Sequence, residues 1–248
     1  MNFKYVVVFG CSYSTDKYPK GAIKGETYGD IIAKHFGAEC INLAQSGTGI
    51  QSLHRKFFEW SSENKHKLKD SLIILGVPPF ERLEMWSNIS KDYFKMGIQK
   101  WDSDEYAPKT SFYYKIFNAW PLEERKNYFK NFYDSNQIFI QTTNLLVGLQ
   151  SFLNLNKVNH IFFDSIWSIH DNDEGSGSYK KPSYWSDVKF NKQHYKDLIS
   201  KDNWYPLVMQ TWLSKDKTLW IGNGNDQHPN PKAHKLWANK LLTFLESK

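Results

Sequence analysis

The feature that most constrains the fold is the apolar run Lys4–Phe9 near the start of the chain, followed directly by the small and polar residues Gly10–Thr15. A short run of β-branched and aromatic residues ended by glycine is typical of a buried strand in a parallel sheet. Ser12 therefore follows the carboxyl end of a strand, the edge at which open α/β sheets bind their ligands. The Ser12 hydroxyl becomes a candidate for chemistry, and a simple turn serine is the alternative.

The second informative segment, residues 222–234, lies near the other end of the chain. Asn230 followed by Pro231 is typical of the N-cap and first residue of a helix, so we expect Asp226 and His228 in the loop just before a closing helix. A serine hydroxyl needs a base to take its proton, and an imidazole needs an acceptor that fixes its tautomer. Ser12, His228 and Asp226 supply these roles of nucleophile, base and orienting acid.

Taken together, these segments resemble the SGNH/GDSL hydrolase superfamily, in which the nucleophilic serine follows the first strand and an Asp-His pair precedes the last helix. Gly10-Cys11-Ser12 stands where the family usually has Gly-Asp-Ser, and this form is similar to a subgroup met in phage and environmental bacterial sequences. Asn42–Gly47 resembles the second family block, whose glycine, here Gly47, donates its backbone N–H to the oxyanion. The resemblance implies a cofactor-free serine esterase that removes O-acyl groups, with O-acetyl groups on a carbohydrate or glycan favoured.

The sequence departs from the family in the spacing of the acid. The commoner family position, three residues before the histidine, holds Asn225, whereas Asp226 lies two residues before His228. The form Asp-x-His-Pro-Asn also resembles a known variant of the family. We therefore assign the orienting role to Asp226.

A second departure lies in the third family block, where a Gly-x-Asn motif normally supplies a side-chain amide to the oxyanion hole. Here Pro78 stands in place of the asparagine, and proline has neither an N–H nor a polar side chain to donate. Losing one oxyanion donor can cost about a hundredfold or more in rate. Arg82 is the expected substitute, and the alternative is that Arg82 pairs with Glu81 or Glu84 on the surface.

The order of the predicted elements indicates an α/β fold. Strands and helices alternate along the chain, with strands expected at 39–43, 71–75 and 159–164 and helices at 26–36, 50–60 and about 121–153. This alternation predicts a three-layer α/β/α sandwich with a mainly parallel central sheet, flavodoxin-like and of the SGNH-hydrolase type, forming a single domain over residues 1–248. Asp164, at the end of the last predicted strand, is a reserve candidate for a site acid.

Two aromatic-rich insertions interrupt this pattern, at about 78–120 and 166–217. The first is longer than a crossover requires, so we expect a cap or lid with short helices of its own, and both insertions should meet over the carboxyl edge of the sheet. Aromatic residues make up 17% of the chain, including 10 Trp. This surplus fits either an aromatic-rich core or a platform for sugar rings.

Composition excludes several classes of function. The net charge of +6 comes from scattered lysines without a basic cluster, so we expect no nucleic-acid partner. Two cysteines, Cys11 and Cys40, favour a reducing compartment, and with neither a leader nor a membrane-spanning run we expect a cytoplasmic protein, or one released by lysis or carried in a virion if phage-encoded. Cys11 is an alternative nucleophile, although a small buried residue is its simpler interpretation. Nothing in the sequence indicates the oligomeric state.

Metal sites are not expected. The acidic segment 171–177 lacks the terminal acidic ligand of a calcium loop, and a surface loop is the simpler interpretation. His170, His194 and His234 lack zinc-like spacing, and we do not expect Asp226, His228 and His234 to bind a metal together. Two functions stay open: a serine ester hydrolase, or an SGNH fold weakened by the loss of the block-three asparagine that acts as a carbohydrate-binding or virion component.

Overall fold

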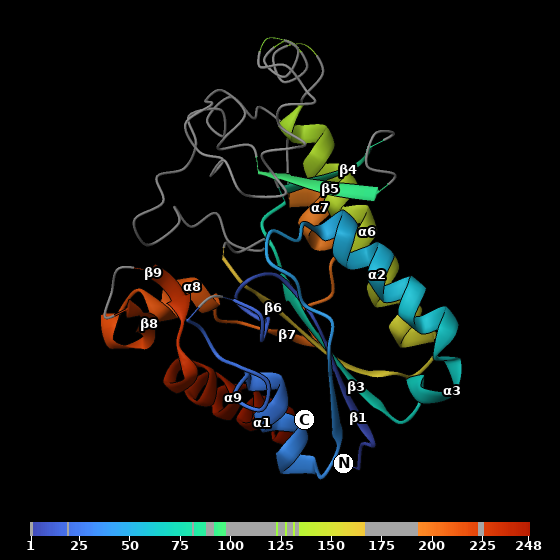
Figure 1. Cartoon of the computed structure of the whole chain (residues 1–248). Coiled ribbons are helices and arrows are strands. Elements are labelled where there is room, and N and C mark those ends of the chain that lie inside the picture. Colours follow the sequence, from blue (N-terminus) through green and yellow to red (C-terminus); the bar gives the residue numbers. More distant parts are fainter. Residues whose placement is uncertain are drawn as a thin grey trace.

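The fold was examined in a computed structural model of the chain. The structure describes residues 2–18, 20–80, 82–87, 92–97, 134–166, 193–222 and 226–248, together with residues 123, 127 and 131. Five strands in these ranges form one parallel sheet with the order β2-β1-β3-β6-β7 (Figure 1). The strands are β1 (Tyr5–Phe9), β2 (Glu39–Asn42), β3 (Ser71–Val77), β6 (Asn159–Asp164) and β7 (Trp204–Tyr205).

The strand order reverses direction at β1. The chain moves from β1 to β2 on one side, and then returns to place β3 on the other side of β1. In open α/β sheets, the carboxyl edge at such a reversal is where ligands bind. The turn that carries Ser12 follows β1 at this point.

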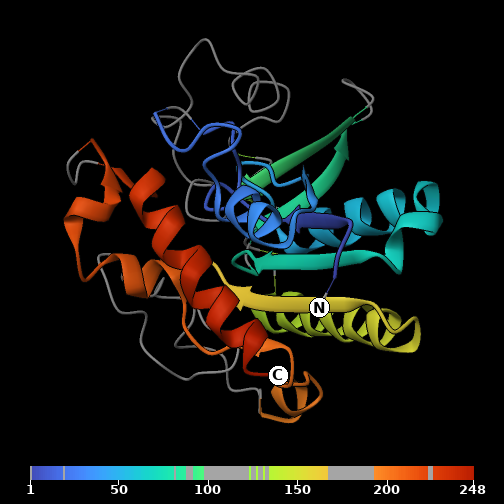
Figure 2. The same cartoon turned by 90° about the horizontal axis from the view of Figure 1, so that it is seen from below.

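Helices cover both faces of the sheet (Figures 1 and 2). Val6 and Val8 of β1 lie in the core shared with one helical layer, whereas Val7 and Phe9 lie in the core of the other layer. This division follows from the alternation of side chains along a strand, and it makes β1 apolar on both faces. The first layer consists of α1 (Tyr28–Phe36) and α9 (Pro231–Glu246), and the second of α2 (Ile50–Glu63) and α6 (Ser135–Leu155).

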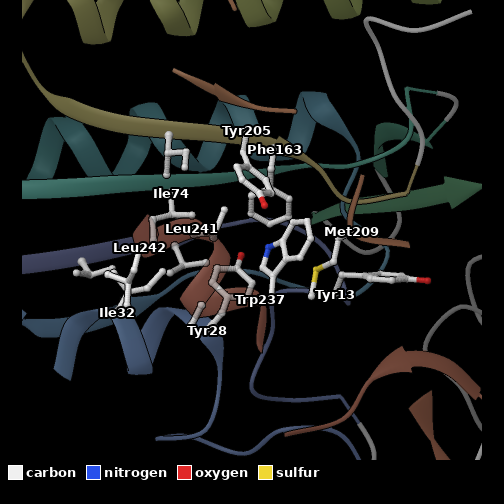
Figure 3. Close-up of a cluster of buried hydrophobic side chains, with 14 of the residues drawn as sticks. Tyr13, Tyr28, Ile32, Ile74, Phe163, Tyr205, Met209, Trp237, Leu241 and Leu242 are labelled. Carbon is white, nitrogen blue, oxygen red and sulfur yellow. The ribbon is translucent and has the colours of Figure 1, made fainter. Parts of the chain in front are cut away.

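Trp237 of α9 lies at the centre of the first core (Figure 3). Its side chain is fully buried, and its ring centroid lies 5.3 Å from that of Phe163 and 5.4 Å from that of Tyr205. Burying a large aromatic side chain contributes about 2–3 kcal/mol. Part of the aromatic surplus therefore serves the core, as one of the two interpretations of the sequence predicted.

The ends of the helices on this face follow the sequence signals closely. Asn230 caps α9 by accepting a hydrogen bond from the backbone N–H of Ala233 (3.0 Å), and Pro231 is the first helical residue. Thr27 caps α1, and Gly37 ends it in the left-handed conformation with φ 65°. The predicted start of α9 and the predicted end of α1 at residue 36 are confirmed, because caps depend on neighbouring residues alone.

The described parts of the two predicted insertions differ from expectation. Within 78–120, the structure has a β-hairpin of β4 (Arg82–Ser87) and β5 (Asp92–Gly97) where we expected short helices. Within 166–217, β7 pairs with β6, so this part belongs to the main sheet. Other parts of both insertions lie outside the described residues. The remaining short elements are α3 (Lys65–Leu68), α7 (Gln193–Asp197), α8 (Met209–Leu213) and the 3₁₀ helix η3 (Lys217–Leu219).

The predicted loop that carries Asp226 and His228 is a short strand in the structure. β9 (Asp226–Pro229) pairs antiparallel with β8 (Trp220–Ile221), outside the main sheet. A two-residue partner strand leaves almost no periodic signal in the sequence. None of the helices in the described residues has the length and apolar character needed to cross a membrane.

His234 joins the two helices of the first layer. Its Nδ1 accepts a hydrogen bond from the backbone N–H of Tyr28 (3.3 Å), and its ring stacks on the Tyr28 ring with centroids 5.7 Å apart. Burial lowers the pKa of His234 to about 4, and nearby Asp30 only partly opposes this effect. His234 is therefore neutral in the folded protein at pH 7, as its acceptor role requires.

We predict that the folded state loses stability as pH falls from 6.5 to about 4, because His234 gains its proton in the unfolded chain before it does so in the folded one. A fall in pKa from 6.5 to about 4 corresponds to about 3 kcal/mol at the acidic end of this window. Thermal unfolding of the wild type and His234→Asn across this pH range measures the effect. The asparagine keeps an acceptor but cannot titrate, so an equally steep loss of stability in the variant would contradict the prediction.

Candidate active site

Ser12 lies in a tight turn at the carboxyl end of β1. The backbone N–H of Ser14 donates to the carbonyl of Cys11 (3.0 Å), which closes the turn. A Cβ atom on Gly10 would lie 2.4 Å from Ser14 Oγ, so the turn has room only for glycine at this position. Ser12 is buried in this turn, and the residue is 6% exposed.

β9 brings the acid and the histidine to this turn from the other end of the chain. Asn230, which caps α9, also donates through its side-chain amide to the carbonyls of Thr218 (2.8 Å) and Trp220 (3.2 Å). One residue thus fixes both the start of α9 and the segment that pairs with β9. The position of His228 depends on how α9 packs against the sheet.

Two successive hydrogen bonds connect Ser12 to His228 and His228 to Asp226, although Ser12 and His228 are 216 residues apart in the chain. Ser12 Oγ lies 2.8 Å from His228 Nε2, and His228 Nδ1 lies 2.5 Å from Asp226 Oδ1. A carboxylate can only accept, so Nδ1 carries the proton and Nε2 is left to accept from the serine hydroxyl. The backbone N–H of His228 also donates to Asp226 Oδ1 (3.1 Å).

The electrostatic environment keeps the histidine neutral and the acid charged. Burial lowers the pKa of His228; the charge of Asp226 opposes this, and the charge of Arg82 adds to it. Burial alone would raise the pKa of Asp226, but hydrogen bonds from His228 and Tyr18 outweigh burial and hold it below its usual value. A neutral imidazole paired with an ionised carboxylate is the state in which a histidine can take a proton.

The Asn42–Gly47 segment packs against the serine turn. The Asn42 side-chain amide donates to the carbonyl of Ser14 (2.9 Å), and the backbone N–H of Gln45 donates to the carbonyl of Gly10 (3.1 Å). Gly47 has φ 75°, a left-handed conformation that other residues adopt only with strain. The fold therefore holds Gly47 in a turn attached directly to the turn of Ser12.

Arg82 is fastened to the same segment. Its Nη1 donates to the carbonyl of Thr48 (3.3 Å), and a Cβ on Gly49 would lie 2.2 Å from the Arg82 carbonyl oxygen. The charge of Arg82 also contributes to the lowered pKa of His228, which places its charge near the histidine. Pro78 ends the buried strand β3 without a polar group to offer to the site.

The alternative partner Glu84 is occupied by another arginine. Arg55 of α2 binds Glu84 through two hydrogen bonds of 2.9 and 3.0 Å, and the Glu84 side chain is 4% exposed. The backbone N–H of Glu84 donates to Gln51 of α2 (2.8 Å). These contacts anchor the β4–β5 hairpin, and hence Arg82, on α2. Glu81, the other alternative partner, lies outside the described residues.

Most of the remaining residues that the sequence offered as site or metal candidates are either buried or outside the described residues. Cys11 is fully buried, and Asp164 is 3% exposed at the end of β6. Asn225, His170 and the acidic segment 171–177 lie outside the described residues. Within the described ranges, no group of three or more His, Cys, Asp or Glu side chains is arranged to hold a metal ion.

Sequence reasoning missed Tyr18. Its ring stacks on the imidazole of His228 with centroids 3.8 Å apart, and its hydroxyl donates to Asp226 Oδ2 (3.1 Å). Tyr18 lies in a loop without apolar periodicity, and the one available signal was its closeness in sequence to Ser12. A tyrosine in a lysine-rich loop gives no indication of a partner 208 residues away.

We predict that Arg82→Met raises the pKa of His228, because removing a nearby positive charge makes the imidazolium less unfavourable. An NMR titration of the histidine ring signals, assigned with His228→Gln, measures this without any substrate. Arg82→Lys keeps the charge and is the matched control. A pKa that is the same in Arg82→Met and the wild type would show that Arg82 exerts no field on the histidine.

No protein-family model matches this chain, and no curated protein matches its sequence. Solved structures match it along its length. TesA aligns over 98% of this chain and 98% of its own, with a TM-score of 0.51 at 10% identity. A carbohydrate esterase aligns over 100% of this chain and 70% of its own, with a TM-score of 0.50 at 16% identity. A lipolytic protein of the G-D-S-L family from Veillonella parvula aligns over 96% of both chains, with a TM-score of 0.44 at 14% identity.

The likenesses to TesA and to the carbohydrate esterase, together with the five parallel strands between two helical layers, show the fold alone. They confirm the predicted three-layer α/β/α architecture. TesA and the carbohydrate esterase share this fold with the chain, an α/β fold of the SGNH-hydrolase type.

Proposed function

We propose that the protein is a serine ester hydrolase in which Ser12 is the nucleophile, His228 the general base and Asp226 the acid that orients the base. The observation that carries this proposal is the pair of connected hydrogen bonds from Ser12 Oγ to His228 Nε2 (2.8 Å) and from His228 Nδ1 to Asp226 Oδ1 (2.5 Å). Two turns at one sheet edge and a strand from the far end of the chain converge on it. Such connected hydrogen bonds activate a serine hydroxyl, because the imidazole can take its proton.

In the first half of the reaction, Ser12 Oγ attacks the ester carbonyl carbon while its proton passes to His228 Nε2. The new imidazolium is stabilised by Asp226, which is already ionised. Collapse of the tetrahedral intermediate breaks the bond to the alcohol, and His228 returns its proton to the leaving oxygen. In the second half, His228 takes a proton from water, which attacks the acyl group on Ser12; the acyl–Oγ bond then breaks, His228 returns the proton to Ser12 Oγ, and the acid is released.

The oxyanion needs donors that point at the serine. We assign the backbone N–H groups of Ser12 and Gly47 to this role, and Arg82 as the third donor that Pro78 cannot supply. Support for Arg82 comes from its attachment to Thr48, beside Gly47, and from its charge near His228. A guanidinium has five N–H donors, so the bond to Thr48 leaves others to face a substrate.

The proposed substrates are O-acyl esters, in particular acetyl esters of a carbohydrate. The resemblance of the Ser12, Gly47 and His228 segments to the SGNH pattern supports the reaction class. A carbohydrate esterase among the neighbours with the same fold supports the class of alcohol. The active site of that neighbour is described as having divergent catalytic and non-catalytic binding functions.

A second candidate function follows from Pro78. If Arg82 does not replace the missing donor, the site would keep its shape and lose much of its rate, since one oxyanion donor is worth about a hundredfold or more. The protein would then act as a carbohydrate-binding or virion component. The labelling experiment below separates the two functions, because covalent labelling requires an activated serine.

We predict that a fluorophosphonate probe labels Ser12 of the folded wild-type protein and does not label Ser12→Ala. The probe reports nucleophilicity, so it needs no knowledge of the natural substrate. Mass spectrometry of the labelled peptide identifies the modified residue and distinguishes Ser12 from the neighbouring Cys11. An adduct on Cys11, or an unlabelled protein with intact secondary structure, would reject the assignment.

We predict that His228→Ala lowers kcat/KM for a small acetyl ester by about 10⁴-fold or more, and that Asp226→Asn lowers it by a smaller factor. The base transfers the proton, whereas the acid orients the base and stabilises its charged form. Asn225→Ala, next to the acid, is the matched control and should change kcat/KM less than either. If Asn225→Asp raised activity while Asp226→Asn had no effect, the acid would be assigned to the wrong position.

We predict that Arg82→Ala lowers kcat for the same ester by at least about tenfold with little change in the unfolding temperature. The loss falls on kcat because a charged donor acts mainly on the developing oxyanion. Arg55→Ala, which removes the anchor of the hairpin, should reduce stability more than Arg82→Ala does. Unchanged turnover in Arg82→Ala would reject Arg82 as a donor and leave an oxyanion hole made of two backbone N–H groups.

A further inference from the structure

We propose that Tyr18 is a positioning residue that holds the Asp226-His228 pair in its working geometry and shields it from water; this inference rests on the proposed function. Tyr18 contacts both members of the pair. Its hydroxyl donates to Asp226 Oδ2 (3.1 Å), and its ring lies nearly parallel to the His228 imidazole at 19°, with centroids 3.8 Å apart.

The hydrogen bond completes the set of donors around the carboxylate. Asp226 Oδ1 accepts from the ring and the backbone of His228, and Oδ2 accepts from Tyr18. A carboxylate held at both oxygens cannot rotate away from the imidazole without losing a charge-assisted hydrogen bond. The Tyr18 hydroxyl is also one of the groups that hold the pKa of Asp226 down against the effect of burial.

The stacked ring acts on the base itself. Tyr18 covers one face of the His228 imidazole, and the Tyr13 ring lies 5.1 Å from the imidazole at a tilt of 41°. The half-buried position that results lowers the pKa of His228. When His228 takes the serine proton, the aromatic face of Tyr18 can stabilise the imidazolium by a cation–π contact.

The loop that carries Tyr18 is fixed at both ends. The chain runs from the serine turn, where the backbone N–H of Lys17 donates to Thr15 Oγ1 (3.2 Å), to the capping box of α1 at Thr27. The backbone N–H of Gly21 donates to the carbonyl of Tyr18 (3.0 Å), which closes a turn directly after it. Tyr18 is therefore placed by the same elements that place Ser12, so one short segment supplies the nucleophile and the support of its base.

Two variants separate the hydroxyl from the ring. Tyr18→Phe removes the hydrogen bond and keeps the stacked ring, whereas Tyr18→Leu removes both. We expect kcat/KM for the acetyl ester to fall about tenfold in Tyr18→Phe and further in Tyr18→Leu, with the rate of fluorophosphonate labelling falling in parallel. Tyr5→Phe, at the amino end of β1 and away from the site, is the matched control and should leave the rate unchanged.

An NMR titration of His228 tests the proposal without substrate. We expect the pKa of His228 to rise in Tyr18→Leu, because the imidazole becomes exposed to water, and the Nδ1 proton signal of the His228-Asp226 bond to exchange faster in both variants. If the pKa of His228 rises in Tyr18→Leu, but the wild-type protein neither hydrolyses esters nor reacts with the probe, the esterase is rejected and the positioning role is retained. If both variants fold and have the same rates, the same His228 titration and the same proton exchange as the wild type, the role of Tyr18 is overturned and the esterase stands.

Discussion

The site depends on one hydrogen bond that joins the two ends of the chain, from Ser12 to His228. Neither residue can reach the other through local structure, because one follows the first strand and the other precedes the last helix. The bond exists because α9 packs on the sheet beside α1, with Trp237 buried against β6 and β7. The apolar core of one face of the sheet therefore sets the distance between Ser12 and His228.

The opposite face supplies the other half of the site. Arg82 reaches the second-block turn because the β4–β5 hairpin is bound to α2, through the Arg55-Glu84 pair and the bond to Gln51. α2 begins at Ile50, directly after this turn, and the absence of a Cβ on its N-cap residue Gly49 lets the hairpin approach. The proposed proton-transfer groups and the proposed oxyanion donors thus depend on different helical layers, and they meet at the edge where the strand order reverses.

The sequence predicted the features that depend on neighbouring residues. The first strand, the Asn230 cap and the parallel sheet follow from local patterns, and these predictions are confirmed. The hairpin, β7 and β9 were not foreseen, because each is defined by a distant partner and is short or irregular. The structure brings Ser12, His228 and Asp226 together as expected in space, whereas their catalytic roles stay predictions. Tyr18 could be found only once the fold had placed it against a residue from the far end of the chain.

The charges around His228 have to satisfy two opposing needs. A base must be neutral before the reaction, which burial and the charge of Arg82 favour, and it must be stable as a cation during it, which Asp226 favours. Removing Arg82 would ease the formation of the imidazolium but would also remove the proposed donor to the oxyanion. In the proposed site, an arginine in place of a neutral asparagine amide couples the oxyanion hole to the base, since one charge acts on both. Asp226, held by Tyr18 and His228, provides the counter-charge that opposes the effect of Arg82 on His228, the proposed base.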